Sequence, residues 1–436
     1  MRKFLALCLI VGCLAVTSLA AQNSPADSGS AQSDNAGTLK FVLILSRHGV
    51  RPPTWTNARL DAYSVEPWPA WSVPPGYLTG HGFELMKRFG GYDRALLAQQ
   101  GLLSAKGCED AAQTYIWADT DERTVESGRA LAEGFFPGCP MVVHGHDTGQ
   151  NDPLFHPRHD AKEHDAAAMT DVNATAKQLP NAGQKELIEQ MQNVLLGCSA
   201  TGACNPAHEP ATMLQDVHAL ATPDTSDRTA EQQKSLSLAA SFSEDFLLEY
   251  LEGMPKAQVG WGHVDENQLR KFLELHTAHA ALTHSIPSVA RNEASNMLFH
   301  ITRTLEQAVE QTPLTDAVGP AESKLVVLVG HDTNIAAVAA LLGLHWTLDG
   351  RADDTPPGAE LQFELWQDHR GVWSVHIGVA MQSLHQMREM QDLTLAAPPA
   401  RETLALQGCS LRQQTCSWQD FRSIADSAID RNAVFH

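Results

Sequence analysis

Three short apolar runs, each followed at once by charged and hydrogen-bonding residues, constrain the fold of this chain most strongly. FVLIL (residues 41–45) leads into SRHGVRPPT, YIWA (115–118) leads into DTDERT, and LVVLV (325–329) leads into GHDTN. Apolar runs of this length are typical of strands that are covered on both faces, as in parallel sheets. We therefore expect an α/β fold with a central, mostly parallel sheet flanked by helices.

The residues after these runs predict helices that begin close to polar clusters. The spacing of Val125, Leu131 and Phe135 indicates a helix with Arg123 near its start, and the alanine- and leucine-rich text after Asn334 indicates another. In open α/β sheets ligands bind beyond the carboxyl ends of the strands, and helix starts there favour an anion. The three polar clusters can therefore converge on one anion site.

The middle of the chain has a different periodicity. Three segments there show helical spacing of apolar residues and few strand signals, namely KELIEQMQNVLLG, AEQQKSLSLAASFSEDFLLEYLEG and ENQLRKFLELHTAHAALTHS. We expect a helical insertion domain at residues 152–312, set into an α/β domain made of residues 39–151 and 313–436. VHGHDTG (143–149) could be a metal site with His144 and His146, but it lacks a further ligand at usable spacing. We expect a loop between the domains there.

The amino-terminal segment is typical of an exported protein. Arg2 and Lys3 precede an apolar stretch that ends in small residues, which predicts a signal peptide at residues 1–21 and a periplasmic or secreted location. A lipoprotein-type cleavage box ending at Cys13 is the alternative, although the chain stays apolar beyond it. Residues 22–38 offer nothing to bury and are expected to be a disordered leader. No later stretch is apolar for long enough to predict a membrane span after signal cleavage.

Six cysteines remain after removal of the signal peptide. In an exported chain they predict three disulfides, for which 15 connectivities are possible. A cysteine metal cluster is the alternative, but no CxxC pair or cysteine–histidine spacing of the zinc type occurs. We expect the three local pairs, namely Cys108 with Cys139, Cys198 with Cys204, and Cys409 with Cys416.

The charge balance limits the possible partners. The chain has 31 basic and 51 acidic residues and a formal charge of −20, which becomes −22 without Arg2 and Lys3. No nucleic-acid partner is expected for such a chain. An anionic substrate would be repelled by the overall field, so a phosphate site has to be built from a local cluster of arginines.

The candidate site residues follow the three apolar runs. Each has an ordinary explanation when taken alone. His48 could be a structural or surface histidine, Arg123 could pair with Asp119 or Glu126 on a helix surface, and Asp332 could cap the helix that follows. Their joint occurrence after three strands favours a common site made of Arg47, His48, Arg51, Arg123, His331 and Asp332.

These motifs also resemble a known family. The chain resembles the histidine acid phosphatases of the phosphoglycerate mutase-like fold. The resemblance rests on RHGVRPPT, DERT and GHDTN in this order, together with YLTGHGFEL, PPGAEL and the cysteine pattern. The nearest group is that of the bacterial periplasmic phytases and glucose-1-phosphatases, and the resemblance covers nearly all of the mature chain.

The resemblance implies a role for each site residue. His48 would be the nucleophile that takes up the phosphoryl group, and Asp332 would protonate the leaving oxygen. Arginine forks match phosphate oxygens, and fixed guanidinium groups stabilise a phosphoryl group in transfer. The expected substrate is a small phosphomonoester, with no metal and no cofactor, and the expected state is a monomer. The oxygens of the phosphoryl group would be held by Arg47, Arg51, Arg123 and His331.

Two neighbouring residues bear on specificity. Thr54 is expected to support the site or to serve only the turn. Trp55 departs from the phytase-type pattern, which often carries a lysine after that threonine. Tryptophan cannot pair with a second phosphate but can pack on a sugar or inositol ring. We therefore expect broad acid phosphatase activity that includes phytate.

The alternative functions are a glucose-1-phosphatase with narrow specificity, a phosphoglycerate mutase, a metallohydrolase built on the HD pairs, and a non-catalytic phosphate-binding protein. Export and disulfides disfavour the mutase, and the presence of both His48 and Asp332 disfavours the binding protein.

Overall fold

The computed structural model describes residues 37–157, 170–171, 174, 181–199, 225–410 and 414–435. The predicted signal peptide and nearly all of the predicted leader lie outside the described residues. No helix in the described part is both long and apolar enough to cross a membrane.

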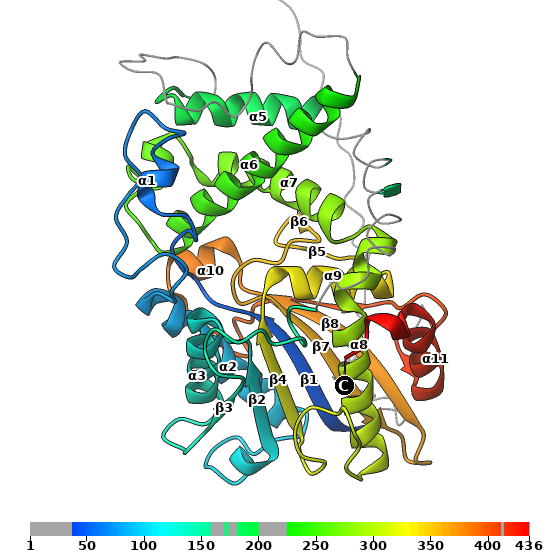
Figure 1. Cartoon of the computed structure of the whole chain (residues 1–436). Helices are drawn as coiled ribbons and strands as arrows, with labels where there is room; N and C mark the ends of the chain where they lie inside the picture. The colour runs from blue at the N-terminus through cyan, green and yellow to red at the C-terminus, as the bar shows by residue number, and fades with distance from the viewer. Residues whose placement is uncertain are drawn as a thin grey trace, which may run out of the picture. The chain divides into compact units, whose positions relative to one another are not determined.

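A mixed sheet of eight strands forms the centre of the described part (Figure 1). Its order is β10-β8-β7-β1-β4-β2-β3, with β9 paired to β8. Strands β1, β4, β2 and β3 are parallel, whereas β7, β8, β9 and β10 form antiparallel pairs. The predicted α/β fold is confirmed. The bounds are β1 (Thr38–Arg47), β2 (Thr114–Ala118), β3 (Val143–His144), β4 (Leu325–Gly330), β7 (Glu360–Gln367), β8 (Trp373–Met381), β9 (Ala400–Leu404) and β10 (Cys416–Ser417).

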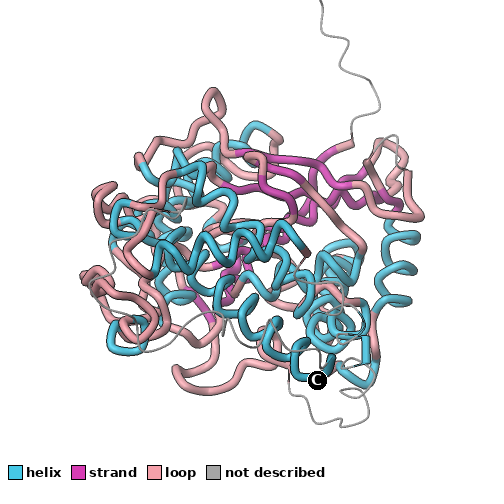
Figure 2. The backbone as a smooth tube through the Cα atoms, turned by 90° about the horizontal axis from the view of Figure 1, so that it is seen from above, coloured by secondary structure: helices cyan, strands magenta, loops and turns pink. Residues whose placement is uncertain are grey.

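Helices cover both faces of the sheet (Figures 1 and 2). Successive side chains of a strand point to opposite faces. Leu43 and Leu45 of β1 lie in a core with side chains of three helices, whereas Val42 and Ile44 lie in another core with two. The first three helices are α8 (Pro287–Glu310), α9 (Asp332–Leu342) and α11 (Trp418–Ala428), and the other two are α2 (Gly80–Gln99) and α3 (Glu122–Phe135).

A separate hydrophobic core lies among the remaining helices. It includes Leu60, Ile188, Phe246, Phe272 and Leu384. Helix α8 falls within residues 152–312 but packs on the sheet, and the division into domains stays a prediction. The helices of this core are α1 (Asn57–Leu60), α5 (Ala182–Leu195), α6 (Thr225–Leu251), α7 (Glu266–Thr283) and α10 (Leu384–Arg388). Short elements complete the described part, namely the hairpin of β5 (Thr347–Leu348) and β6 (Arg351–Ala352) and the turns η1 (Ala111–Gln113), η3 (Val259–Gly262) and η4 (Arg431–Ala433).

The register of the parallel strands brings their carboxyl ends to one edge. Arg47 pairs with Gly330, and Ala118 pairs with Val329. Beyond the strands, the His48 N–H donates to the Gly330 carbonyl at 2.9 Å and the Asp119 N–H donates to the Val329 carbonyl at 3.0 Å. The loop after β1 also lies against α2, where a side chain at Gly82 would meet the Val50 carbonyl at 2.3 Å. The segments after β1, β2 and β4 are therefore held next to one another.

Two local expectations need correction. Helix α9 begins at Asp332 and not after Asn334, because the Asn334 Oδ1 accepts the His331 N–H at 2.9 Å and so closes the first turn earlier. Val143 and His144 form strand β3 where a loop was expected, because their backbone extends the parallel ladder beside Ile116 and Trp117.

Two of the predicted disulfides are present. Cys108 is joined to Cys139, and Cys409 is joined to Cys416. Cys198 is also in a disulfide, but its predicted partner Cys204 lies outside the described residues.

Candidate active site

The loops that follow β1, β2 and β4 supply most of the predicted site residues. Arg47 is the last residue of β1, His48 follows it, and both are 1% exposed. Arg51 lies in the same loop and is 8% exposed. Arg123 is in the first turn of α3, and His331 and Asp332 stand at the start of α9. The rings of His48 and His331 meet edge to face with centroids 5.7 Å apart. The residues predicted from three distant motifs therefore lie together.

The imidazole of His48 is held in one tautomer. Its Nδ1 lies 2.8 Å from the Gly49 carbonyl, which can only accept, so Nδ1 carries the proton and Nε2 keeps a free electron pair. Burial, followed by the charges of Arg51, Arg47 and Arg123, lowers the pKa of His48 well below its ordinary value. These effects favour the neutral ring, the state in which a histidine nitrogen can act as a nucleophile.

Two guanidinium groups beside His48 share one carboxylate. Arg47 donates to the Thr355 carbonyl at 2.6 Å and to Glu244 Oε1, and Arg51 Nη2 lies 3.2 Å from the same oxygen. Burial acts to raise the pKa of Glu244, but the charges of Arg47 and Arg51 outweigh it and the pKa is lowered. An anionic oxygen thus bridges two arginines, which is the arrangement that a phosphate oxygen requires.

Arg123 also lies close enough to His48 for its charge to help lower the pKa of that histidine. It pairs with Asp121 Oδ2 at 2.6 Å, and its Nη2 lies 3.5 Å from the Nδ1 of His331. The two partners considered from the sequence, Asp119 and Glu126, contact other residues instead.

Asp332 lies between the arginines and a small cavity. Its Oδ2 is 3.7 Å from Arg47 Nη2 and 3.9 Å from His276 Nε2. Burial acts to raise the pKa of Asp332, but the charges of Arg47, His276 and Arg51 hold it below its usual range. The adjoining cavity of about 180 Å³ is lined by Asp332, His276, His279, His284 and Glu244 among others. A leaving group placed in this cavity would reach the carboxyl of Asp332.

A second carboxylate, Asp119, contacts two histidines. Its Oδ2 lies 2.6 Å from His331 Nε2 and 2.7 Å from His156 Nε2. Burial acts to raise the pKa of Asp119, but the hydrogen bonds from His156 and His331 outweigh it and the pKa lies below its usual range. The hydrogen bond to Asp119 raises the pKa of His156.

Thr54 and Trp55 follow Arg51 in the loop after β1. Thr54 is exposed, and a side chain placed at Gly76 would lie 3.7 Å from both its methyl group and Arg123 Nη1. Trp55 is partly buried against Tyr63 and Phe242, with ring centroids 6.2 and 6.4 Å apart. The guanidinium of Arg59 lies over the Trp55 ring, 3.4 Å from its centroid. A positive charge therefore stands next to Trp55 although Trp55 itself carries none.

Sequence reasoning missed several residues that contact the predicted ones, among them Asp121, which pairs with Arg123. Asp119 was considered only as a partner for Arg123, although it directly follows an apolar run, and this signal could have found it. His156 lies in NDPLFHP (residues 151–157), which follows none of the three apolar runs, and it was not among the predicted residues. Glu244 and His276 lie on α6 and α7, where charged residues in helical text look like surface positions and give no signal.

Two groups of the described residues could hold a metal ion. One is Glu244, His276 and Asp332, and the other is Asp119, Asp121, His156 and His331. Both overlap the predicted phosphate site, which was expected to need no metal.

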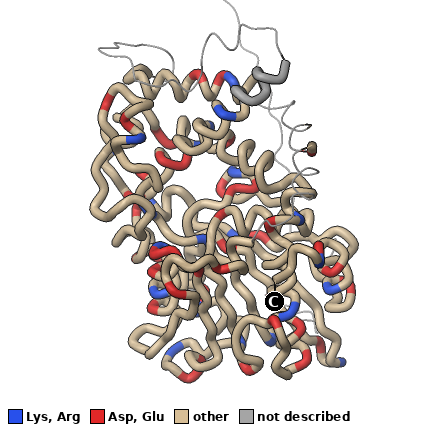
Figure 3. The backbone as a smooth tube through the Cα atoms, in the orientation of Figure 1, with Lys and Arg blue, Asp and Glu red and all other residues tan. Residues whose placement is uncertain are grey.

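The arginines contrast with the rest of the chain. Acidic residues outnumber basic ones, 51 to 31, and are spread along the backbone (Figure 3). Arg47, Arg51 and Arg123 therefore supply a local attraction for an anion that the chain as a whole would repel.

Comparisons with known proteins agree with the motifs. Residues 38–379 match the model of the histidine phosphatase superfamily, branch 2. The phytase AppA of Escherichia coli is 34% identical, covering 92% of this chain and 94% of its own length. The glucose-1-phosphatase of Salmonella typhimurium is 31% identical, covering 89% of this chain and 92% of its own.

A solved structure of the Hafnia alvei phytase with tartrate has a TM-score of 0.78 and 31% identity, and the match covers 92% of this chain and 99% of that one. The chain belongs to the histidine phosphatase superfamily, branch 2, and is a phosphoric monoester hydrolase.

Proposed function

We propose that this protein is an exported acid phosphatase that hydrolyses phosphomonoesters, phytate among them, through a phosphohistidine at His48. The observation that carries the proposal is the hydrogen bond of 2.8 Å between His48 Nδ1 and the Gly49 carbonyl. It fixes the proton on Nδ1 and leaves Nε2 free to attack phosphorus. The low pKa of His48 keeps this electron pair available in acid.

The reaction has two displacement steps in this proposal. In the first, Nε2 of His48 forms a bond to phosphorus while the bond to the ester oxygen breaks, and Asp332 gives its proton to that oxygen. In the second, a water oxygen forms a bond to phosphorus while the bond from Nε2 to phosphorus breaks, the water gives a proton back to Asp332, and inorganic phosphate leaves. Dividing hydrolysis in this way replaces one difficult step by two easier ones. The charge on the phosphoryl oxygens is stabilised in both steps by Arg47, Arg51, Arg123 and His331.

The low pKa of Asp332 requires that the substrate change its protonation. In the free site Arg47, His276 and Arg51 favour the charged carboxylate. A bound phosphate neutralises the arginines and adds negative charge nearby, and both effects raise the pKa of a carboxyl group. Asp332 therefore takes up its proton when the substrate binds. The phosphate must also displace Glu244 from Arg47 and Arg51, since both anions use the same donors.

The proposed location rests on the cysteines as well as on the amino terminus. Disulfides such as Cys108–Cys139 and Cys409–Cys416 persist in oxidising compartments. The proposal therefore includes removal of residues 1–21 as a signal peptide, a periplasmic or secreted monomer, and an insertion at residues 152–312 that brings Glu244 and His276 to the site. Sequencing the amino terminus of the mature protein and measuring its mass in solution test the first two points.

The substrate range is tested directly with the purified protein. Turnover of phytate, glucose 1-phosphate and p-nitrophenyl phosphate is measured between pH 3 and 8. We expect all three to be hydrolysed. A protein that turns over only glucose 1-phosphate is a narrow glucose-1-phosphatase, a function favoured by the 31% identity with the glucose-1-phosphatase of Salmonella typhimurium. A protein that binds phosphate without any turnover is a binding protein.

The nucleophile is tested with His48→Ala. We expect this variant to lose turnover and to yield no acid-labile phosphoprotein after quenching with radiolabelled substrate, while it keeps affinity for inorganic phosphate. His345→Ala is the control, because His345 is an exposed histidine whose side chain pairs with Asp353, outside the site. Near-normal kcat in His48→Ala would contradict the assignment.

A further inference from the structure

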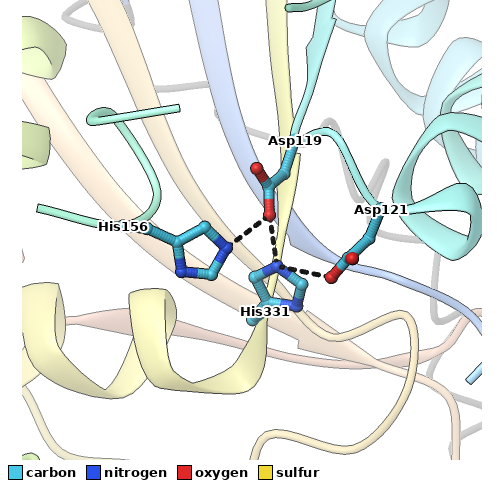
Figure 4. A group of neighbouring side chains, drawn as sticks. All are labelled: Asp119, Asp121, His156 and His331. Carbon is cyan, nitrogen blue, oxygen red and sulfur yellow. Dashed lines mark hydrogen bonds and ion pairs between the residues drawn. The ribbon is translucent and has the colours of Figure 1, made fainter. Parts of the chain in front are cut away.

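A group of two histidines and two aspartates lies beside the phosphate site (Figure 4). Asp119 follows β2, Asp121 precedes α3, His331 precedes α9, and His156 comes from the loop after β3. Their ligand atoms all lie within 4.8 Å of one another. Neither Asp119 nor His156 has a part in the proposed reaction, so the group calls for an explanation of its own.

The spacing of the group fits a tetrahedral ion. His331 Nε2 is 2.6 Å from Asp119 Oδ2 and 3.7 Å from Asp121 Oδ2, and His156 Nε2 is 2.7 Å from Asp119 Oδ2. Two ligand atoms that each lie about 2.0–2.2 Å from a tetrahedral zinc are roughly 3.4 Å apart. The contacts of 2.6 and 2.7 Å need to open by less than an ångström, and the contact of 3.7 Å needs to close slightly.

One oxygen of the Asp119 carboxylate accepts no hydrogen bond from the described residues. Its side chain is 0% exposed, and both histidines contact the same oxygen, Oδ2. The other oxygen, Oδ1, is buried with no hydrogen-bond partner among the described residues. A buried carboxylate oxygen without a donor is costly unless some further group binds it. A small rotation of the carboxylate offers this second oxygen to an ion.

We propose that Asp119, Asp121, His156 and His331 form a binding site for Zn²⁺ or a similar divalent transition-metal ion, and that the bound ion inhibits the enzyme. Two imidazole nitrogens and two carboxylates make a donor set that zinc accepts. At each histidine the ion takes the place of the Nε2 proton. A neutral ring then carries its one proton on Nδ1, and a charged ring releases one proton to solvent.

The inhibition follows from contacts with Arg123. In the metal-free site Arg123 pairs with Asp121 at 2.6 Å and points Nη2 at His331 Nδ1, 3.5 Å away. An ion on His331 Nε2 occupies the atom that would donate to a phosphate oxygen and puts a proton on Nδ1, which then opposes the N–H of Arg123, and the charge of the ion repels the guanidinium group. Arg123 and His331 are thereby lost to the phosphate, a consequence that rests on the roles proposed for them above.

The first experiment measures binding without reference to activity. Protein treated with EDTA and freed of the chelator is titrated with zinc sulfate in a calorimeter, and with cobalt chloride while the visible spectrum is recorded. We expect one ion per chain and the intense bands of tetrahedral cobalt. His156→Gln, which can still donate to Asp119, should weaken zinc binding by about 10-fold or more, the scale on which metal sites respond to loss of a supporting group.

The matched control is His146→Gln. His146 is also partly exposed and lies 3.9 Å from an aspartate, Asp152, but it is outside the group. The zinc affinity of the His146→Gln variant should equal that of the wild type. His276→Gln distinguishes the other candidate group, Glu244, His276 and Asp332. If His276→Gln abolishes zinc binding and His156→Gln does not, the ion is in that group and the proposal is wrong.

The second experiment measures inhibition. p-Nitrophenyl phosphate is the substrate, because phytate itself binds divalent ions through its phosphates. Zinc should lower kcat/KM, because the ion removes Arg123 and His331 from a phosphate that they are proposed both to bind and to stabilise in transfer. The inhibition constant of His156→Gln, relative to its own metal-free activity, should rise by the same factor as its dissociation constant for zinc. Absence of zinc binding, or binding without any effect on kcat/KM, overturns the proposal. Failure of the proposed function appears separately, as absence of turnover in metal-free wild type.

Discussion

The replacement Asp332→Asn tests the proposed acid most directly, because asparagine keeps the shape of the side chain and removes the proton. General-acid catalysis contributes about 10²- to 10⁴-fold, which corresponds to roughly 3–5 kcal/mol in the activation free energy. The full loss is expected only where the leaving oxygen needs a proton. The alkoxide of glucose needs one, whereas p-nitrophenolate, with a pKa near ~7, can leave without one.

The same replacement removes a negative charge from the phosphate site. The Asp332 Oδ2 lies 3.7 Å from Arg47 Nη2, and a pair of unit charges about 4 Å apart near a protein surface interacts by about 4 kcal/mol. Part of that attraction becomes available to the substrate when Asp332 is neutral. We therefore expect KM to fall for both substrates while kcat falls strongly for glucose 1-phosphate only.

Glu244→Gln is the matched control for this experiment. Glu244 is another partly buried carboxylate that pairs with Arg47, and its replacement also removes one charge without changing the shape. It is not proposed to donate a proton, so its effect on kcat should be the same for both substrates. Steady-state kinetics of the two variants on glucose 1-phosphate and p-nitrophenyl phosphate decide the matter. Equal losses of kcat on both substrates in Asp332→Asn would refute proton donation by Asp332.

Three further predictions concern charge and metal. Because His48 must be neutral to attack, kcat/KM should fall only as the pH drops through its lowered pKa; Arg51→Gln removes one cause of the lowering and should move this acid limb to higher pH. If the acid side of the kcat/KM profile does not move in Arg51→Gln, the titrating group is not His48. Trp55→Lys should lower KM for phytate but not for p-nitrophenyl phosphate, and this decrease in KM should become smaller as salt is added. If the wild type already prefers phytate and Trp55→Lys changes nothing, the Arg59 guanidinium over the Trp55 ring is the first candidate for that contact. EDTA should leave activity intact, and a loss that zinc or magnesium restores would contradict the arginine-based mechanism.

The sequence predicted the sheet because its central strands are covered on both faces and therefore read as unbroken apolar runs. Leu43 and Ile44, neighbours on β1, are buried in different cores. It also predicted that Arg47, His48 and His331 would lie together, because parallel strands end at one edge. Glu244 could not be predicted in this way. It reaches Arg47 and Arg51 only through the packing of α6, and local sequence carries no signal for such a contact.

The start of α9 and strand β3 show a second limit. At α9 the helical periodicity begins later than the helix, whose first turn is closed by the side chain of Asn334. Strand β3 has two residues and exists because β2 offers a free edge, which is a property of the neighbour and not of the segment itself.

The central position of β1 has a consequence for how the chain is made. Its neighbours in the sheet are β4 and β7, so Val42 cannot pair with its strand partners Leu325 and Glu364 until those residues have been made. A ribosome releases β1 first and both partners only near the end. Until then β1 is an apolar strand with two open edges, which favours aggregation. The residues of the Cys108–Cys139 bond reach the oxidising compartment before β4 and β7, whereas those of Cys409–Cys416 arrive after them, so only the first bond can close while β1 is unpaired. Recovery of activity during refolding should therefore depend on this late long-range pairing, and it should lag behind the formation of helical structure.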